Sequence, residues 1–268
     1  MTELTYPLTV DEGERAETRS ELTELSTMII RALRLSLRNV DGLITALALP
    51  VMLMVMFVYF FGGAIHVGER YIDYVVPGVL LVCAGFGAGT TAVTVSADLA
   101  GGIVDRFRSL DVHPRSLLAG HVVASVGRNL ISAALAVAVA VALGFSPQAS
   151  LGEWLAAIGL LSLFILALSW LAAAIGVLMH SPEGAQGITF LISFLPYPSS
   201  AFVPISTMPS WLQGFARHQP VTAVIDSLRA LLSGHAPGPA AVTAVAWSLG
   251  IIAASVIAAG VLFARRVR

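Results

Sequence analysis

The densest group of charged side chains in the sequence lies between residues 96 and 115, in the segment SADLAGGIVDRFRSLDVHPR. Carboxylates and guanidinium groups alternate there, and this mixture is suited to salt bridges with a second protein. The charged residues are Asp98, Asp105, Arg106, Arg108, Asp111 and Arg115. Gly101 and Gly102 interrupt a helix and Pro114 can restart one, so the segment can project as a short docking helix. It is equally consistent with a solvated loop whose arginines only set the orientation of the chain.

Motifs for catalysis and metal binding are missing from the sequence. The six histidines are scattered and form no H-E-x-x-H pair, so we expect no metal site. No G-x-S-x-G elbow is present, and we assign no catalytic residue. All 15 basic residues are arginine, which excludes the phosphate-binding loop G-x-x-x-x-G-K-[ST]. We therefore expect neither an enzyme nor a chain that binds its own cofactor, and we expect no nucleic-acid partner.

Long apolar blocks occupy most of the remaining sequence. Hydrophobic residues make up 57% of the 268 positions and charged residues only 12%, whereas about 25% are charged in a soluble domain. A helix needs about 20 apolar residues to cross the hydrocarbon of a bilayer. We predict an all-α polytopic protein with six transmembrane helices in contact with membrane lipid. The predicted spans are residues 43–62, 74–97, 117–143, 154–179, 185–205 and 240–263.

The distribution of arginine predicts how the chain is oriented. Cytoplasmic flanks of membrane spans carry an excess of basic residues. With the amino terminus inside, only Arg70, Arg217 and Arg229 fall on the outer side. Both termini are therefore predicted to be cytoplasmic, in a multi-pass protein of the inner (plasma) membrane. Residues 1–21 are polar and acidic, lack the order of a secretory signal, and are predicted to be a disordered cytoplasmic tail.

Residues 22–41 are predicted to form an amphipathic helix ahead of the first span. Apolar residues recur there at steps of three and four, while arginines share the opposite face. This pattern is typical of a helix that lies along the inner membrane surface. An ordinary amphipathic helix packed on a protein partner is the alternative.

Arg128 lies inside the third predicted span, where a guanidinium group is costly unless it is satisfied. The helix can begin in the cytoplasm and carry Arg128 near the interface, where the side chain reaches the headgroups. Alternatively, Arg128 faces a polar, protein-lined cavity that accommodates a substrate. We favour the first explanation and keep Arg128 as a candidate residue of a translocation path.

The end of the fifth predicted span and the residues just after it contain four closely spaced prolines, Pro196, Pro198, Pro204 and Pro209. Each proline ring removes a backbone donor and clashes with the preceding helical turn. Broken backbone at membrane depth is tolerated only where protein or water covers it. We therefore predict a re-entrant segment or an extracellular cap over residues 206–235.

Within this cap, the sequence from Pro220 to Leu232 predicts a short amphipathic helix. Proline stands at its start, and Gly234 follows its end. Asp226 and Arg229 are three residues apart and can form an ion pair on one face. Trp211 is suited to the outer membrane interface. A folded external loop without a role in transport is the alternative.

Three features occur in a fixed order: the amphipathic helix, the acid-and-arginine segment, and the proline-broken fifth span with its external helix. Together they resemble the type-2 ABC transporter permease family, most closely the daunorubicin-resistance type of drug-export permease. Asp105-Arg106-Phe107-Arg108-Ser109-Leu110 is similar to the cytoplasmic signature of that family. The carboxy-terminal signature is matched by three segments, Phe202-Val203-Pro204, Met208-Pro209-Ser210-Trp211-Leu212 and His218-Gln219-Pro220-Val221, with Arg229 downstream.

The resemblance spans residues 22–268 and implies a single ABC-2 type transmembrane domain. It implies a permease that pairs with a second permease, identical or homologous, and with two cytoplasmic ABC ATPase subunits that bind ATP and Mg. It implies that residues 98–113 are the coupling segment, contacting the ATPase through the residues Asp98, Asp105, Arg106, Phe107 and Arg108. The cap would gate the outer side, and its candidate residues are Pro196, Pro198, Pro204, Pro209, Trp211, Pro220 and Arg229.

The expected function is ATP-driven export of hydrophobic or amphipathic compounds such as a drug, a polyketide antibiotic or a lipid. An ion-coupled secondary transporter is the alternative. That class usually needs an ionisable residue at the membrane centre and often shows repeated halves. Only Arg128 comes near the first requirement, and the sequence shows no repeat.

Overall fold

The computed structural model of the chain describes residues 48, 50–65, 67–101 and 114–266. Within these ranges every regular element is a helix, so the predicted all-α class is confirmed for this part of the chain. The predicted tail (1–21), the amphipathic helix (22–41) and most of the coupling segment lie outside the described residues.

In the described part of the chain, four helices are long and apolar enough to cross a membrane. They are α3 (Tyr71–Ala100), α5 (Pro114–Ala142), α6 (Leu151–Leu178) and α10 (Gly238–Arg266). They overlap the second, third, fourth and sixth predicted spans. Six spans remain a prediction, because the first span is only partly described and the fifth is not a helix of spanning length.

Shorter helices and the turns between them make up the rest of the described chain. An apolar helix, Pro50–Phe61, ends in the π-helical turn η1 (Phe57–Phe61). The fifth predicted span corresponds to α7 (Pro182–Ser193), which stops three residues before Pro196. The 3-10 turn η2 (Ile205–Thr207), α8 (Ser210–His218) and α9 (Pro220–Leu232) follow. At about 1.5 Å per residue, α7 extends about 18 Å, which is little more than half of a bilayer's hydrocarbon.

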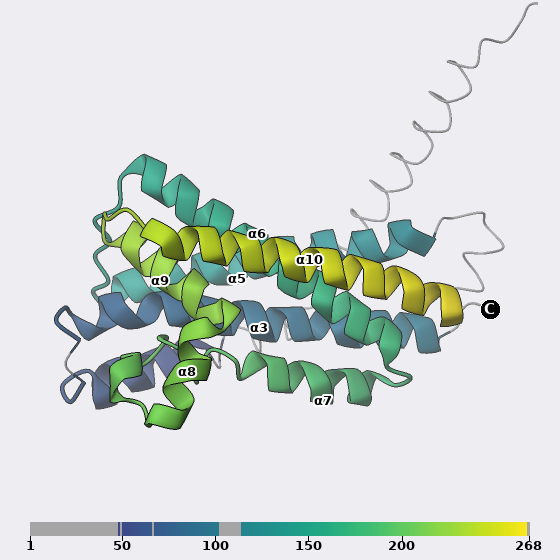
Figure 1. Cartoon of the computed structure of the whole chain (residues 1–268), viewed down its shortest axis with the longest axis horizontal. Coiled ribbons are helices and arrows are strands. Elements are labelled where there is room, and N and C mark those ends of the chain that lie inside the picture. The colour runs from purple at the N-terminus through teal and green to yellow at the C-terminus, as the bar shows by residue number, and fades with distance from the viewer. Residues whose placement is uncertain (1–47, 49, 66, 102–113, 267–268) are drawn as a thin grey trace, which may run out of the picture.

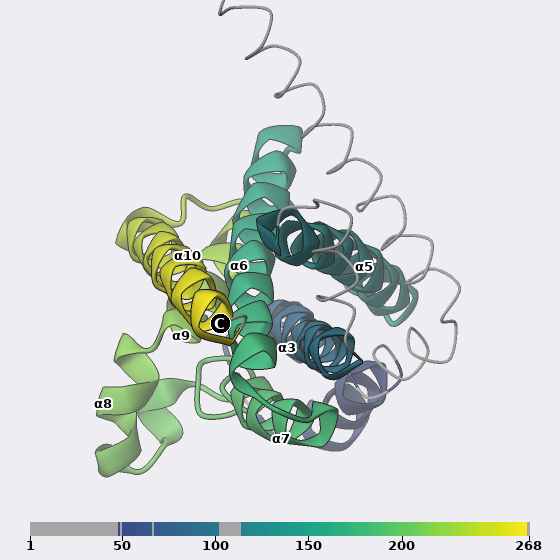
Figure 2. The ribbon, with the colours of Figure 1, turned by 90° about the vertical axis from the view of Figure 1, so that its right-hand side faces the viewer.

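The long helices lie side by side along the long axis of the molecule, and α7 accompanies them over only part of that length (Figure 1). We call the end that carries α8 and α9 the α9 end. The opposite end, where α3 and α10 finish and α5 begins, is the C-terminal end. Seen along the bundle, α3 lies among α5, α6 and α7, whereas α10 packs on the other side of α6 (Figure 2). Helix α3 is the most buried of the four long helices.

Glycines let the backbone of other elements approach α3 and α6 closely. A methyl group on Gly78 would lie 2.6 Å from Cβ of Ala201, and one on Gly176 would lie 2.6 Å from the carbonyl oxygen of Ala92. Both distances are shorter than side chains tolerate. Small residues at helix contacts are typical of membrane bundles, because close packing rather than hydrophobicity holds helices together in lipid.

Among the residues that the structure describes, buried apolar side chains form two separate clusters. The larger one surrounds the first two thirds of α3 and includes residues of α5, α6 and α9. The smaller one, the C-terminal cluster, joins α3, α5, α6 and α10 at the C-terminal end. Its buried members are Val95, Leu118, Val122, Ala173, Ala174, Val177, Ala259 and Phe263. The two ends of the bundle are thus held by different sets of contacts.

Candidate functional site

Helix α9 places a charged pair against the rest of the bundle. Pro220 occupies the first turn, and Gly234, with φ of +73°, follows the last turn, so the helix has the bounds that the sequence predicts. Val221, Val224 and Leu228 are buried on its apolar face. The predicted ion pair is confirmed: Nη1 of Arg229 lies 2.9 Å from Oδ1 of Asp226.

The Arg229 guanidinium binds two other elements at once. Its Nε and Nη2 each donate to the carbonyl oxygen of Tyr74 in α3, both at 3.2 Å. Nη2 also donates to the carbonyl oxygen of Ser200 at 2.6 Å. The guanidinium carbon lies 3.8 Å from the centre of the Tyr74 ring, a cation–π contact. Asp226 in turn accepts a hydrogen bond from Oγ of Ser200 at 2.6 Å. We call these four residues the Arg229 clamp.

The clamp fixes the proline-rich segment between α7 and η2. This segment consists of turns that contain Pro196 and Pro198. The hydroxyl group of Tyr71 donates to the carbonyl oxygen of Phe202 at 2.8 Å, and Nε2 of Gln219 donates to the carbonyl oxygen of Pro198. The Phe202 ring stacks on that of Phe57, with centroids 4.4 Å apart. Broken backbone is thereby held against α3 and the short apolar helix.

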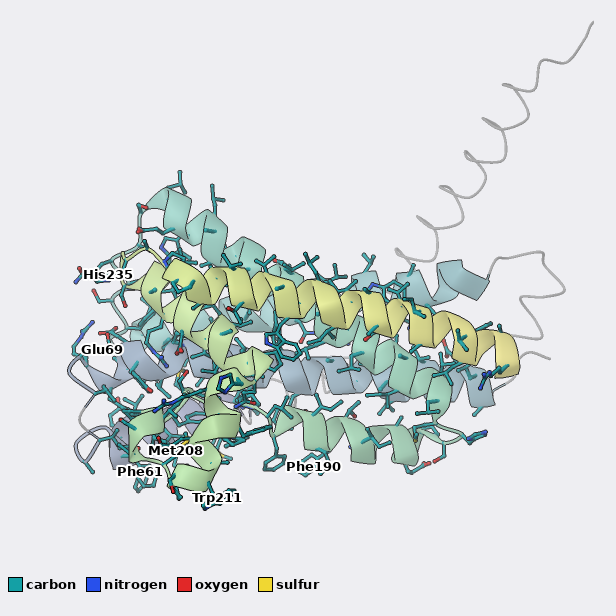
Figure 3. All side chains as sticks on the ribbon, in the orientation of Figure 1. Phe61, Glu69, Phe190, Met208, Trp211 and His235 are labelled. Atoms are coloured by element: carbon teal, nitrogen blue, oxygen red, sulfur yellow. The ribbon has the colours of Figure 1, made fainter. Side chains whose placement is uncertain are left out.

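Pro204 and Pro209 stand immediately before η2 and α8, respectively. Helix α8 is tied to α9 by the hydroxyl group of Thr222, which donates to the carbonyl oxygen of Ala216 at 2.6 Å. The Trp211 side chain points away from the bundle and is 79% exposed (Figure 3). The predicted cap residues thus belong to one connected structure at the α9 end.

The loops at the α9 end are linked to α3 as well. Arg70 forms an ion pair with Asp73 at 2.8 Å and donates to the carbonyl oxygen of Gly144 at 3.1 Å. Glu69 and His235 lie at this end of the molecule (Figure 3). The Glu69 side chain is exposed, yet neighbouring protein removes part of its water shell and raises the pKa of the carboxyl group. The charge of Arg229 acts in the opposite direction.

Of the predicted coupling residues, Asp105, Arg106, Phe107 and Arg108 lie outside the described residues. Asp98 is described, and it lies in the last turn of α3, which continues past the predicted end of the second span. Its Oδ2 is 3.0 Å from Nε2 of His121 in α5. Sequence reasoning did not single out His121, because the two residues are 23 positions apart and only the packing of α5 on α3 joins them.

Arg128 lies midway along α5, about 21 Å from the start of that helix at the usual rise. Its Nη2 donates to the carbonyl oxygen of Gly87 at 3.1 Å and to Oγ1 of Thr91 at 3.0 Å, both in α3. The guanidinium therefore turns toward the protein at this depth.

Further buried polar groups surround Arg128. Asn129 donates to the carbonyl oxygen of Ser125 at 3.0 Å, and Ser169 of α6 donates to Oγ of Ser125 at 2.9 Å. The glycine-rich stretch of α3 makes room for them, because a methyl group on Gly87 would collide with Oδ1 of Asn129. Polar contacts thus join α3, α5 and α6 in the middle of the bundle.

The long apolar helices and the polar contacts between them are those of a polytopic helical membrane protein. Its short helices η2, α8 and α9 gather at the α9 end. Comparison with known proteins identifies the family of the chain. Residues 23–232 match the family model described as "ABC-2 type transporter". The chain therefore belongs to the ABC-2 type transporter family, as its signatures predicted.

Two curated relatives agree with this assignment. The daunorubicin resistance ABC transporter permease protein DrrB1 of Streptomyces coeruleorubidus is 28% identical over 242 residues, covering 90% of this chain and 83% of the relative. The probable doxorubicin resistance ABC transporter permease protein DrrC of Mycobacterium tuberculosis is 24% identical over 216 residues, covering 80% of this chain and 78% of the relative. The chain is thus an ABC-2 permease homologous to permeases of drug resistance transporters.

Proposed function

We propose that this permease exports hydrophobic or amphipathic compounds, such as a drug, a polyketide antibiotic or a lipid, using ATP hydrolysed by separate subunits. The observation that carries the proposal is the similarity to the daunorubicin resistance permease, which covers nearly the whole of both chains. The family match over residues 23–232 includes α3, α5, α6 and the α9 end, and is therefore more than a common short motif.

The energy source is a cytoplasmic ABC ATPase, present in two copies. The family implies such a partner, and the lysine-free sequence contains no phosphate-binding loop of the G-x-x-x-x-G-K-[ST] type. ATP and Mg therefore bind to the partner subunit and not to this chain. In this arrangement the C-terminal end faces the cytoplasm of a plasma-membrane protein. The connection from α3 to α5, which lies within residues 98–113, is at this end and contacts the ATPase.

A second permease chain, identical or homologous, covers the face formed by α7 and the short apolar helix. Helix α7 is too short to span, and beyond Ser193 the chain continues in irregular turns that need protein around them at membrane depth. This face also presents large apolar side chains, including Phe190 and Leu191 of α7 and Phe60 of the short helix. Phe61, Trp211 and Phe190 lie along one edge of the molecule (Figure 3). A second permease that packs on this face surrounds α7 and the irregular turns with protein. The export path then runs between the two chains.

The Arg229 clamp and the proline-rich segment form the outer gate in this proposal. Opening requires that the segment changes its contacts with α3, because these contacts hold it in the structure described here. ATP can drive such a change only if the ATPase binds the inward and outward states with different affinity.

The test is to co-express the chain with the ATPase encoded beside its gene and to measure ATP-dependent uptake of fluorescent daunorubicin by inside-out vesicles. Charge reversal by Arg106→Glu and Arg108→Glu is expected to abolish co-purification with the ATPase and uptake together. Arg265→Glu, an exposed residue at the same end, is the matched control and is expected to retain both. Uptake by the permease without any ATPase, or undiminished co-purification of the reversed variant, would contradict the proposal.

A further inference from the structure

We propose that Asp98 and His121 form a positioning pair that makes α3 and α5 move as one unit when the ATPase acts on the segment between them. The inference rests on the proposed function, because it concerns how an ATP-driven movement enters the permease. It gives Asp98 a partner inside the permease, whereas the family resemblance implied an ATPase contact.

The pair joins the two helices on either side of residues 101–113. Asp98 is the third residue from the end of α3, and His121 is the eighth residue of α5. The 3.0 Å contact between their side chains is mostly withdrawn from solvent, with exposed fractions of 21% for Asp98 and 14% for His121. A hydrogen bond between such groups is stronger at a partly buried position than at an open surface.

The position of Asp98 in the last turn of α3 does not favour the helix itself. The last turn of a helix carries partial negative charge, so a carboxylate there is unfavourable. Helix α3 has an acidic residue at this place and no basic residue in its last turn to offset it. His121 supplies the missing donor from the neighbouring helix. The compensation therefore depends on α5 staying beside α3.

Around the pair, apolar contacts and a hydrogen bond join α3 to neighbouring elements at the C-terminal end. Val95 lies one turn before Asp98, and Leu118 and Val122 lie beside His121 along α5; all three are buried in the C-terminal cluster. On another side of α3, the hydroxyl group of Ser96 donates to the carbonyl oxygen of Met179 at 3.4 Å. Apolar contacts alone hold helices weakly in a membrane, since lipid is as apolar as the side chains. The polar pair supplies the attachment that lipid cannot replace.

A force on the segment between the helices can either splay α3 and α5 or move them together. With the pair closed, movement at the cytoplasmic end is passed along α3, which contacts the proline-rich segment and the Arg229 clamp at its other end. Without the pair, part of the movement is lost as separation of the helix ends. The pair thus sets how much transport follows from each ATP.

The test uses the full permease reconstituted with its ATPase and compares cargo moved with ATP hydrolysed. Asp98→Asn and His121→Asn are each expected to lower the cargo moved per ATP by about threefold or more, a usual size for a lost coupling contact. Co-purification with the ATPase is expected to persist. The exchanged variant, Asp98→His with His121→Asp, is expected to restore most of the ratio. Glu183→Gln and His180→Asn, exposed residues at the same end, are matched controls expected to leave it unchanged.

A cross-linking experiment separates positioning from support of the fold. In a Cys83→Ala background, Asp98→Cys with His121→Cys is expected to transport poorly until a short bifunctional thiol reagent joins the two helices, and then to recover. Failure to recover, or single variants with the wild-type ratio, would overturn the positioning role. Loss of ATPase co-purification in the single variants would also overturn it. If the unmodified complex moves no cargo with ATP, the proposed function itself fails, and the inference fails with it.

Discussion

At the scale of single residues, two arginines anchor other helices to backbone carbonyl groups of α3. Arg229 of α9 binds the carbonyl oxygen of Tyr74, and Arg128 of α5 binds that of Gly87. Arginine is suited to this task because its planar group offers several donors in fixed directions. The two side chains therefore serve as connections between helices.

Replacement of Arg229 is the sharpest test of the clamp. Arg229→Ala leaves the two carbonyl oxygens and Asp226 without the charged donor, and we expect a loss of about 2 kcal/mol in stability. Arg229→Lys keeps the charge but lacks the fork of donors, so an intermediate loss is expected. Thermal unfolding of the detergent-purified chain measures both.

Arg217→Ala is the matched control for the clamp, because Arg217 is an exposed arginine of α8 at the same end. Its contact with Gln213 is long and lies at the surface, and such contacts contribute little. An unfolding midpoint of Arg229→Ala equal to that of Arg217→Ala would show that the clamp does not stabilise the fold.

Only one contact of the Arg229 clamp could be predicted from the sequence. The Asp226–Arg229 pair follows from helical spacing, because residues three apart share a face. Tyr74 lies 155 positions from Arg229, and Ser200 lies 29 positions away. No local pattern joins them, since both contacts arise where separate elements meet. The Asp98–His121 pair was missed for the same reason.

At the level of single helices, local sequence signals predicted the bounds of α9 but not the end of α7. The bounds of α9 follow from a proline at the start and a glycine after the end, both of which act locally. The prolines after α7 likewise indicated a break, but not that the helix would stop at Ser193 and leave a 12-residue element. The path of the chain after the break is set by α3, α9 and the short apolar helix, to which the turns are bonded.

Gly78 tests whether close contact with α3 holds the proline-rich segment. Gly78→Ala places a methyl group 2.6 Å from Cβ of Ala201 and 2.9 Å from its carbonyl oxygen. Because backbone must move to relieve this overlap, we expect a loss of about 1–3 kcal/mol. Gly159→Ala in α6 is the control, since nothing lies near the added methyl group. Thermal unfolding of the two variants compares them, and equal midpoints would refute the importance of the contact.

At the scale of the whole molecule, the exposed faces differ in what they require of their surroundings. Most of α10 is exposed as a regular apolar helix, for which lipid is a sufficient neighbour. The face of α7 combines a short helix with irregular backbone, for which lipid is not sufficient. This difference is the physical basis for placing the second permease beside α7.

Cross-linking between chains tests that placement. With Cys83 replaced by alanine, Phe190→Cys on α7 is expected to form a dimer on mild oxidation in membranes, because the proposed arrangement places this exposed side chain against the second permease. Val242→Cys on α10, exposed to 73%, is the control and is expected to remain monomeric. Gel electrophoresis without reductant reports the result. A dimer through Val242 alone, or no cross-link at Phe190 to either the same chain or a co-expressed homologous permease, would contradict the arrangement.

The membrane character of this chain, the positions of its long helices and its family could all be predicted from local features of the sequence. Composition, hydrophobic length and short signatures are local properties, and they report directly on the solvent that each segment needs. The tertiary structure alone decided that α3 is the most buried long helix, that Arg229 and Arg128 bind to it, and that Asp98 pairs with His121. The reason is that lipid makes all apolar faces equivalent, so helices choose their neighbours by close packing at small residues and by a few polar contacts between distant positions.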